Sequence, residues 1–346
     1  MSENVNLPNP SKILQVGMGY WGSKTLLTAV GLELFTLLGN QQLHGNEIKK
    51  ELDLHDRSLY DFLDALVALG FLERSTGIRD NAVYQNTPET SLFLDKNSET
   101  YIGGILEMSN TRLFRFWNGL EKGLKTGEPQ NEVKFGDKPV FETLYATEES
   151  TREFIDAMAG IQMANFMTLA KTFDFSPYTT HCDLGGSGAH LSMTLSRHQP
   201  HLRSVSFDLP AVTPIAQSNI DKAGLSEQVT VASGDFFNDQ IPRADIITMG
   251  NILHDWNLEE KKNLIAKVCK ALNEKGCLIV IENVIDDERR NNAFGLLMSL
   301  NMLIETPGGF DYSAQDFDTW ARECGFIHTK KIPLTGPSSA LIAYKS

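Results

Sequence analysis

The stretch HCDLGGSG, residues 181–188, decides the fold, because it has the form of a β-strand end that runs into a glycine-rich turn. A helical pattern from Ala189 to Arg197 follows, and the run SVSFDLP (204–210) is a second strand that ends in an acid, Asp208. Glycines in such a turn let a ligand approach the backbone, because no Cβ stands in the way. The acid can accept hydrogen bonds from both ribose hydroxyls of a nucleoside.

A dinucleotide is the alternative ligand for this arrangement, and the details of the turn argue against it. The dinucleotide fingerprint reads G-x-G-x-x-G and closes on a pyrophosphate, whereas this chain reads G-G-S-G and has no Arg or Lys there for phosphates. We therefore expect an adenosine ligand without a pyrophosphate. The residues expected to surround it are Asp183, Gly185, Gly186, Gly188, Asp208 and Leu209.

The next run, VTVASGDFF (229–237), predicts a strand that carries Gly234, Asp235 and Phe236 to the carboxyl edge of the sheet. Ligands of open α/β sheets bind at that edge. Asp235 could accept a hydrogen bond from the adenine amino group while Phe236 packs on the ring. The alternative is purely structural, with a capping Asp and two core phenylalanines.

A candidate general base follows the predicted strand ADIITM (244–249), in the segment GNILHDW (250–256). Imidazole has an unperturbed pKa of about 6.5 against about 10 for a phenol, so His254 can be neutral at cellular pH and still accept a proton. Glu282 ends the run CLIVI (277–281), and Asp311 follows PGGF (307–310). Either carboxylate could orient the imidazole.

The amino-terminal part shows helical patterns with short interruptions and no alternation of strands and helices. Helical patterns run over Ser23–Leu38, Leu43–Leu54 and Leu59–Leu69, the last with Asp56 as expected N-cap and Gly70 as expected stop. Two short strands, 71–74 and 82–85, lie around a turn with Gly77. Three helices and a β-ribbon are the outline of a winged helix.

A winged helix raises the hypothesis of DNA binding, which the charge pattern disfavours. Residues 1–100 carry eight Lys or Arg against thirteen Asp or Glu, and the helix that would enter the major groove contains three Asp and one Arg. Such a helix would be repelled by phosphates. The formal charge of -13 on the whole chain points the same way, so we expect no nucleic-acid partner.

Length and composition favour two well-packed domains, since 346 residues exceed what one core usually organises. The four cysteines show no C-x-x-C spacing, which predicts buried thiols with neither disulfides nor a metal site. The amino terminus has no basic segment followed by an apolar run, and no uncharged stretch reaches the ~18 residues that a membrane span needs. These features predict a cytoplasmic protein without a membrane partner.

Large apolar side chains recur in the helical stretch from about 101 to 175, and such spacing usually means core. The cluster could also line a pocket for a flat ligand, because Met and Phe adapt to such shapes. Trp117, Phe154, Met158 and Phe166 are the candidates for contact with a substrate. The chain ends in two β-like runs, 326–332 and 339–344, which predict a closing antiparallel hairpin.

In combination and order, these motifs resemble the small-molecule O-methyltransferases of the plant caffeate and animal hydroxyindole type and their bacterial relatives. The resemblance runs from the winged-helix-like start through DLGG (183–186), FDLP (207–210), GDFF (234–237), ILHDW (252–256) and PGG (307–309). It departs from the family at Ser187, at Gly250, where plant members often have Lys, and at Asp311, where Glu is usual.

The resemblance implies an α/β fold, with a Rossmann-like class I methyltransferase sheet of seven strands and an amino-terminal domain that intertwines in a homodimer. It implies S-adenosylmethionine as cofactor, a role in secondary metabolism, and methyl transfer to a small aromatic molecule at a hydroxyl oxygen. Expected domains are 1–100 for dimerisation, 101–175 for a helical linker and substrate pocket, and 176–346 for cofactor binding and catalysis. We also expect Asn251 at the cofactor and Asp255, Met298 and Met302 at the substrate.

Two other readings of the function stay open on the sequence alone. The same scaffold could methylate carbon or nitrogen, since the neighbourhood of Asp311 departs from the usual pattern. A non-catalytic regulator that uses the winged helix is the third, and the presence of Asp183, Asp208, Asp235 and His254 speaks against it.

Overall fold

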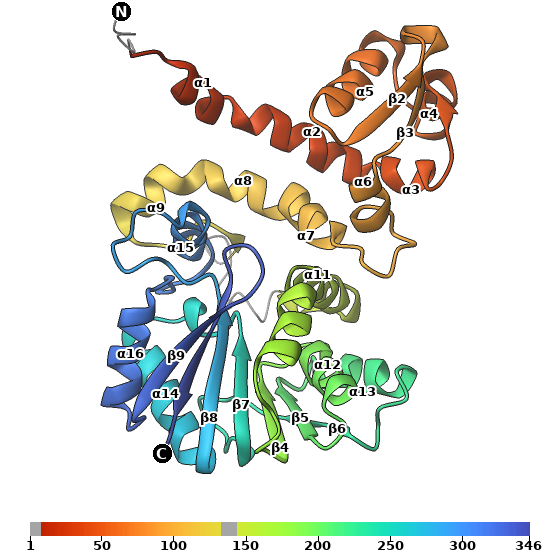
Figure 1. Ribbon diagram of the computed structural model, residues 1–346. Coiled ribbons are helices and arrows are strands. Elements are labelled where there is room, and N and C mark those ends of the chain that lie inside the picture. Colours follow the sequence, from red (N-terminus) through yellow and green to blue (C-terminus); the bar gives the residue numbers. More distant parts are fainter. Residues whose placement is uncertain (1–7, 133–143) are drawn as a thin grey trace, which may run out of the picture. The chain divides into compact units, whose positions relative to one another are not determined.

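The computed structural model describes residues 8–132 and 144–346, which form two compact units that meet in the sequence at Arg112 and Leu113 (Figure 1). The first unit combines short helices with a small three-stranded sheet. Its elements are α1 (Ser11–Gly17), α2 (Gly19–Gly31), α3 (Leu34–Leu38), β1 (Leu43–His44), α4 (Gly45–Glu51), η1 (Asp56–Ser58), α5 (Leu59–Ala68), β2 (Leu72–Thr76), η2 (Arg79–Asn81), β3 (Val83–Asn86), α6 (Pro88–Phe93), α7 (Gly103–Met108) and the π-helical turn η3 (Ser109–Leu113).

The predicted β-ribbon of the winged helix is confirmed. β2 and β3 pair antiparallel, with Leu72 opposite Asn86, and β1 adds a third strand through Leu43 opposite Tyr84. Gly77 lies in the turn at φ +69°, where a Cβ would stand 2.2 Å from the Asn81 carbonyl oxygen, so only glycine fits. The buried core of this unit includes Leu34, Phe35, Leu38, Ile48, Leu59, Leu63, Leu66 and Tyr84.

Three helix predictions in this unit need correction. The pattern over Ser23–Leu38 is two helices, because Glu33 takes a left-handed φ of 57° and breaks α2 from α3. The pattern over Leu43–Leu54 begins with the strand residues of β1, and His44 caps α4. Asp56 lies inside η1 and pairs with Lys49 at 2.5 Å instead of capping α5, whereas Gly70, at φ +81°, follows the end of α5 as predicted.

The second unit is a seven-stranded sheet with helices on both faces, as predicted (Figure 1). Its strands are β4 (Thr180–Leu184), β5 (Arg203–Asp208), β6 (Val229–Ser233), β7 (Ala244–Gly250), β8 (Leu272–Glu282), β9 (His328–Pro333) and β10 (Ser339–Tyr344). Its helices are α8 (Phe114–Phe116), η4 (Trp117–Gly119), α9 (Leu120–Thr126), α11 (Glu148–Thr172), α12 (His190–His198), α13 (Thr213–Lys222), η6 (Leu253–Asp255), α14 (Leu258–Ala271), α15 (Ala293–Glu305) and α16 (Ala314–Glu323).

The strand order β6-β5-β4-β7-β8-β10-β9 places the first five strands parallel, and their carboxyl ends share one edge. The predicted closing hairpin is confirmed, since β10 pairs antiparallel with both β8 and β9. Successive side chains of β8 point to opposite faces of the sheet. Leu278 and Val280 belong to the core with α14 and α16, while Ile279 and Ile281 belong to the core with α11 and α12.

Two further features of the described residues concern the cysteines and the helices. All four cysteines are free thiols, three of them buried and Cys324 half-buried. Across 8–132 and 144–346, none of the helices combines the length and the apolar character that a membrane crossing requires.

Candidate functional site

A cavity of about 660 Å³ opens in the second unit at the carboxyl ends of β4, β5 and β7. All the residues predicted to hold the cofactor line it, with the exception of Gly188. The lining consists of Tyr145, Phe154, Met158, Ala159, Gln162, Phe166, Asp183, Gly185, Gly186, Ser187, His190, Leu191, Asp208, Leu209, Pro210, Ala211, Gly234, Asp235, Phe236, Gly250, Asn251, Ile252, Asp255 and Trp256.

The glycines of the turn after β4 let neighbouring side chains pack directly against the backbone of the turn. A Cβ on Gly185, which has φ +70°, would stand 2.3 Å from Ile252, and one on Gly186 would stand 2.3 Å from the Ser206 hydroxyl. The same holds at Gly188, whose Cβ would meet the His190 ring at 2.5 Å. Gly188 therefore permits close packing behind the turn and does not line the cavity.

Asp208 and Asp183 are the two carboxylates at the floor of the turn. Asp208 accepts hydrogen bonds from the backbone N–H groups of Ser187 (2.8 Å) and Leu209 (2.7 Å). Burial raises the pKa of Asp208 to about 6 against the effect of these two donors, and burial raises the pKa of Asp183 to about 7. Both carboxylates are partly desolvated, which strengthens any hydrogen bond that they accept from a ligand.

Asp183 is also held from behind by a buried chain that sequence reasoning missed. The Thr248 hydroxyl donates to Asp183 Oδ1 at 2.6 Å and lies 2.8 Å from His181 Nε2, while His181 Nδ1 lies 3.0 Å from the Ser204 hydroxyl. Burial lowers the pKa of His181 to about 3, so the ring is neutral. The strand β4 thus positions Asp183 through partners on β5 and β7.

Asp235 and Phe236 line the cavity, and both also have structural contacts of the kind that the alternative reading expected. Asp235 Oδ1 accepts from the N–H of Phe237 at 2.8 Å, as a local turn cap does, and Asp235 also lines the cavity. The Phe236 ring lies edge-on to Trp256, with centroids 5.9 Å apart. Lys267 donates to the carbonyl oxygens of Phe236 and Phe237 at 2.8 and 2.9 Å, which fixes this segment from α14.

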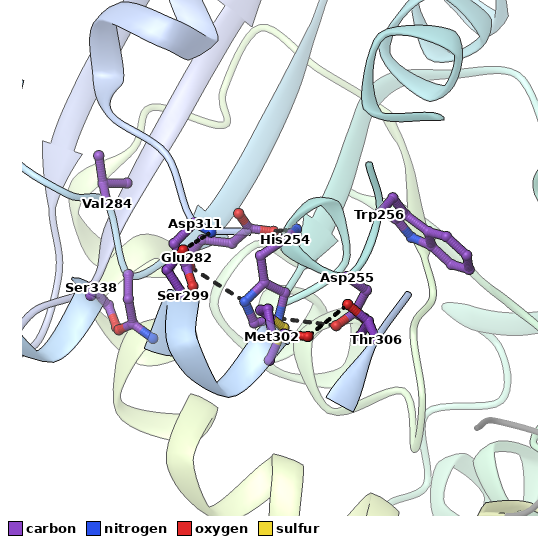
Figure 2. A network of polar contacts seen from close by, with 12 residues as sticks. His254, Asp255, Trp256, Glu282, Val284, Ser299, Met302, Thr306, Asp311 and Ser338 are labelled. Carbon is purple, nitrogen blue, oxygen red and sulfur yellow. Dashed lines mark hydrogen bonds and ion pairs between the residues drawn. The ribbon is translucent and has the colours of Figure 1, made fainter. Parts of the chain in front are cut away.

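The predicted base is buried among three acids, of which Glu282 and Asp311 are buried, while Asp255 is half-buried and lines the cavity (Figure 2). His254 Nδ1 lies 3.4 Å from Asp311 Oδ1, and His254 Nε2 lies 3.6 Å from Asp255 Oδ1. Both contacts are longer than well-formed hydrogen bonds, and neither Nδ1 nor the Asp311 oxygens have a hydrogen-bond partner in the described chain. Glu282 accepts instead from the backbone N–H of His254 at 3.1 Å. Of the two predicted orienting acids, Asp311 therefore faces the ring and Glu282 holds its backbone.

These acids control the charge of the imidazole. Burial favours the neutral ring, but Asp255, Asp311 and Glu282 outweigh it and raise the pKa of His254 to about 10. Burial also raises the pKa of Asp255 to about 7, partly offset by His254. With these acids around it, the His254 ring favours its protonated, positively charged form.

Of the predicted substrate residues, Phe154, Met158, Phe166 and Asp255 line the cavity, whereas Trp117, Met298 and Met302 lie outside its lining. The Trp117 indole donates to Asn301 on α15 at 2.9 Å, so its polar edge already has a partner. Met302 is buried on the same helix and lies near His254 in Figure 2. Its carbonyl oxygen accepts from the Thr306 hydroxyl at 2.9 Å.

Several lining residues carried no usable signal in the sequence. Tyr145 and Gln162 sit in segments that have no motif, and only the fold brings them to the cavity. His190 could have been found, because it stands two residues after the glycine-rich motif. Trp256 could have been found, because it follows His254 and Asp255 directly.

The comparisons with known proteins decide the family. The pattern of the O-methyltransferase domain matches residues 117–327, and that of the O-methyltransferase dimerisation domain matches residues 14–96. The chain belongs to this O-methyltransferase family. Its members depend on S-adenosylmethionine, and the cavity fits that cofactor, since the glycine turn lines it together with two carboxylates, the buried Asp183 and the half-buried Asp208.

Relatives of this methyltransferase match it over nearly the whole length. The Streptomyces glaucescens tetracenomycin polyketide synthesis 8-O-methyl transferase TcmO is 37% identical over 345 residues, which cover 100% of this chain and 99% of the relative. The 3-hydroxy-5-methyl-1-naphthoate 3-O-methyltransferase of Streptomyces sahachiroi is 27% identical over 95% and 93% of the two chains. The structure of human N-acetylserotonin methyltransferase in complex with SAM has a TM-score of 0.90 at 25% identity, covering 100% of both chains.

Proposed function

We propose that this methyltransferase transfers a methyl group from S-adenosylmethionine to a hydroxyl oxygen of a small aromatic metabolite, with His254 as the general base. The observation that carries the proposal is the position of His254. Its ring is buried between Asp311 and Asp255, and Asp255 lines the cavity that the cofactor-binding residues also line.

The residues proposed to hold the cofactor are those that line the cavity around the glycine turn. When bound, the cofactor supplies an electrophilic methyl group on a positively charged sulfur. Asp208 can accept hydrogen bonds from the ribose hydroxyls, Asp235 from the adenine amino group, and Phe236 can pack on the adenine ring. Asn251 adds a side-chain oxygen that is buried and has no hydrogen-bond partner in the described chain.

The aromatic nature of the acceptor is supported by the rest of the lining. Phe154, Met158, Phe166 and Trp256 give the cavity flat or adaptable apolar walls. The Streptomyces sahachiroi relative is named for a naphthoate that carries the hydroxyl to be methylated. We therefore propose an acceptor with a ring hydroxyl, with Phe154, Met158 and Phe166 against its ring and Asp255 near its polar edge.

His254 can act as a base only when its ring is neutral. A positive charge placed near an imidazole favours the neutral ring, so we expect the pKa of His254 to fall when the cavity holds the cationic cofactor. Neutral His254 would then accept the proton of the acceptor hydroxyl as its oxygen takes the methyl group, and the electron pair of the broken carbon–sulfur bond would stay on sulfur, which becomes a neutral thioether. Asp311 stabilises the imidazolium that results, and Glu282 keeps the His254 backbone in place.

The proposal extends to the whole chain. We infer a homodimer formed through the amino-terminal domain (1–100), with 101–175 contributing to the substrate pocket and 176–346 holding the cofactor. We also infer a cytoplasmic location and no nucleic-acid partner. The acidic α5 region supports the last point, and a gel-shift assay at low salt tests it, because tight binding to duplex DNA would contradict it.

The function is tested by mass-spectrometric screening of hydroxylated aromatic metabolites with methyl-labelled S-adenosylmethionine. We expect one labelled methyl group on a ring oxygen of at least one acceptor, located by NMR of the product. Label found on carbon or nitrogen would replace the proposed acceptor atom, and no transfer to any aromatic acceptor would contradict the proposal.

A further inference from the structure

Lys261 is a fully buried lysine that the proposed mechanism does not use. It lies in the first turn of α14, and its side chain has 0% exposure. Burying an ammonium group costs free energy unless other groups replace its hydration. The groups around Lys261 therefore indicate its role. The Lys261 ammonium donates to the carbonyl oxygen of Trp256 and lies 3.7 Å from the ring centroid of Phe310 and 5.7 Å from that of Tyr312.

These contacts connect the two segments that form the base cluster. Trp256 stands two residues after His254, and Phe310 and Tyr312 stand on either side of Asp311. The ammonium therefore joins the turn that carries the imidazole to the segment that carries its orienting acid. A cation over an aromatic face is attracted by the ring, most strongly where water is excluded.

The charged groups that act on His254 are acids. The ring faces Asp255 from its own turn and Asp311 from the segment after α15, and Glu282 from β8 holds its backbone. The acids that act on Lys261 are these three and Glu260 of its own helix. When His254 is neutral, as a base must be, Lys261 is the remaining positive charge among these groups.

We propose that Lys261 is a positioning residue for the methyl transfer, whose charge lets His254 be neutral amid three acids and whose contacts hold Asp311 against the ring. The inference rests on the proposed role of His254 as base. Burial lowers the pKa of Lys261 to about 8 against the pull of Glu282, Asp255 and Asp311, so the charge is present at neutral pH.

The test is the pH dependence of kcat with saturating S-adenosylmethionine and acceptor. The acid limb of this profile is the pH range in which kcat rises as His254 loses its proton. In Lys261→Met the lost positive charge favours the imidazolium, so the acid limb moves to higher pH by about one unit. At neutral pH kcat falls about tenfold, and it recovers at higher pH. Lys261→Gln removes the charge but keeps a donor toward Trp256, and it should move the limb equally. Lys261→Arg keeps the charge and should leave the limb in place.

The matched control is Lys262→Met, which removes a positive charge from the neighbouring residue. Lys262 is paired with Glu323 on α16 at 2.7 Å, outside the base cluster, so its loss should not move the limb. A limb that stays in place in both Lys261→Met and Lys261→Gln would overturn the proposal. So would a limb that moves equally in Lys262→Met.

A second readout does not depend on activity. The His254 imidazole can be followed by NMR in the cofactor complex, its signal identified by its disappearance in His254→Gln. We expect its titration midpoint to rise by about one unit in Lys261→Gln. An unchanged midpoint of His254 in Lys261→Gln would contradict the role of Lys261, even if the enzyme transfers methyl groups. A raised midpoint in an enzyme that transfers no methyl group would contradict only the proposed function.

Discussion

Asp208 is the residue whose carboxylate ties the glycine turn to the proposed ribose site. It accepts two backbone hydrogen bonds and lines the cavity at the same time. We expect Asp208→Ala to weaken S-adenosylmethionine binding by about 10- to 100-fold, the effect of losing hydrogen bonds to a charged group. Calorimetry measures it, with Asp221→Ala on the exposed side of α13 as control. Equal dissociation constants for wild type and Asp208→Ala would remove Asp208 from the site.

Asp311 makes the opposite electrostatic contribution to that of Lys261. Asp311→Asn keeps the shape but removes a negative charge that helps to raise the pKa of His254. We expect the acid limb of kcat to move to lower pH, because the imidazole becomes neutral more easily. The plateau of kcat should fall by at least ~10-fold, since the imidazolium loses its stabilising partner. A limb that stays in place or moves upward would exclude Asp311 as the partner of the ring.

The sequence was informative about acids and glycines and uninformative about Lys261. Asp208 and His254 could be predicted because Asp208 ends β5 and His254 lies in the short turn after β7. Glu282 and Asp311 were both candidates, and only the fold shows that one faces the ring and the other the backbone. A lysine in the charged run EEKK (259–262) suggests a solvated surface, so its burial could not be predicted before packing was known.

At the scale of elements, Asp245 joins three strands at the amino edge of the sheet. Its carboxylate accepts from the N–H groups of Thr179 and Thr180 at 2.9 Å and from Asn273 of β8 at 2.9 Å. Burial opposes ionisation, but these donors prevail and hold the pKa of Asp245 below its usual 3.8. The carboxylate form therefore stabilises the start of β4, β7 and β8.

We expect Asp245→Ala to reduce the free energy of unfolding by about 1–2 kcal/mol at pH 7. Because the folded pKa lies below the unfolded one, this stabilisation is present above pH 4 and is lost as pH falls through the folded pKa. Urea unfolding at pH 7 and at decreasing pH measures both effects, with the exposed Glu274→Gln on β8 as control. The role of Asp245 would be contradicted if the difference in free energy of unfolding between the wild type and Asp245→Ala stayed constant down to pH 3 or below.

Strands were easier to predict than helix boundaries. Each parallel strand of the second unit ends at or directly before an acid or a glycine, and the observed strands overlap the predicted runs, although β8 begins at Leu272, five residues before the run predicted at 277–281. The helix pattern over Ser23–Leu38 hid the break at Glu33, because the apolar spacing continues across it. A non-glycine residue with a left-handed backbone conformation cannot be recognised from the spacing of apolar residues.

At the scale of the whole molecule, the dimer is the main inference. Ile13, Val16 and Trp21 on α1 and α2 are 75%, 73% and 60% exposed, although such residues are usually covered. These three residues form what we term the α1/α2 apolar face, which lies within the match to the dimerisation domain except for Ile13. We propose that a second copy of the chain covers it.

Trp21→Glu tests the α1/α2 apolar face. A buried charge opposite an apolar partner should raise the dimer dissociation constant by at least ~10-fold, measured by sedimentation velocity over a range of concentrations. Ile327→Glu, which places the same charge at an exposed apolar site of the second unit, should leave it unchanged. Equal dissociation constants in Trp21→Glu and wild type would place the interface elsewhere.

The single-turnover rate of His254→Ala, measured beside its affinity for S-adenosylmethionine, tests the central claim most directly. With His254 as the base and the cofactor held by other residues, the rate should fall ~100- to 10,000-fold while the dissociation constant stays near that of the wild type. An unchanged rate of methyl transfer at full cofactor occupancy would contradict the claim.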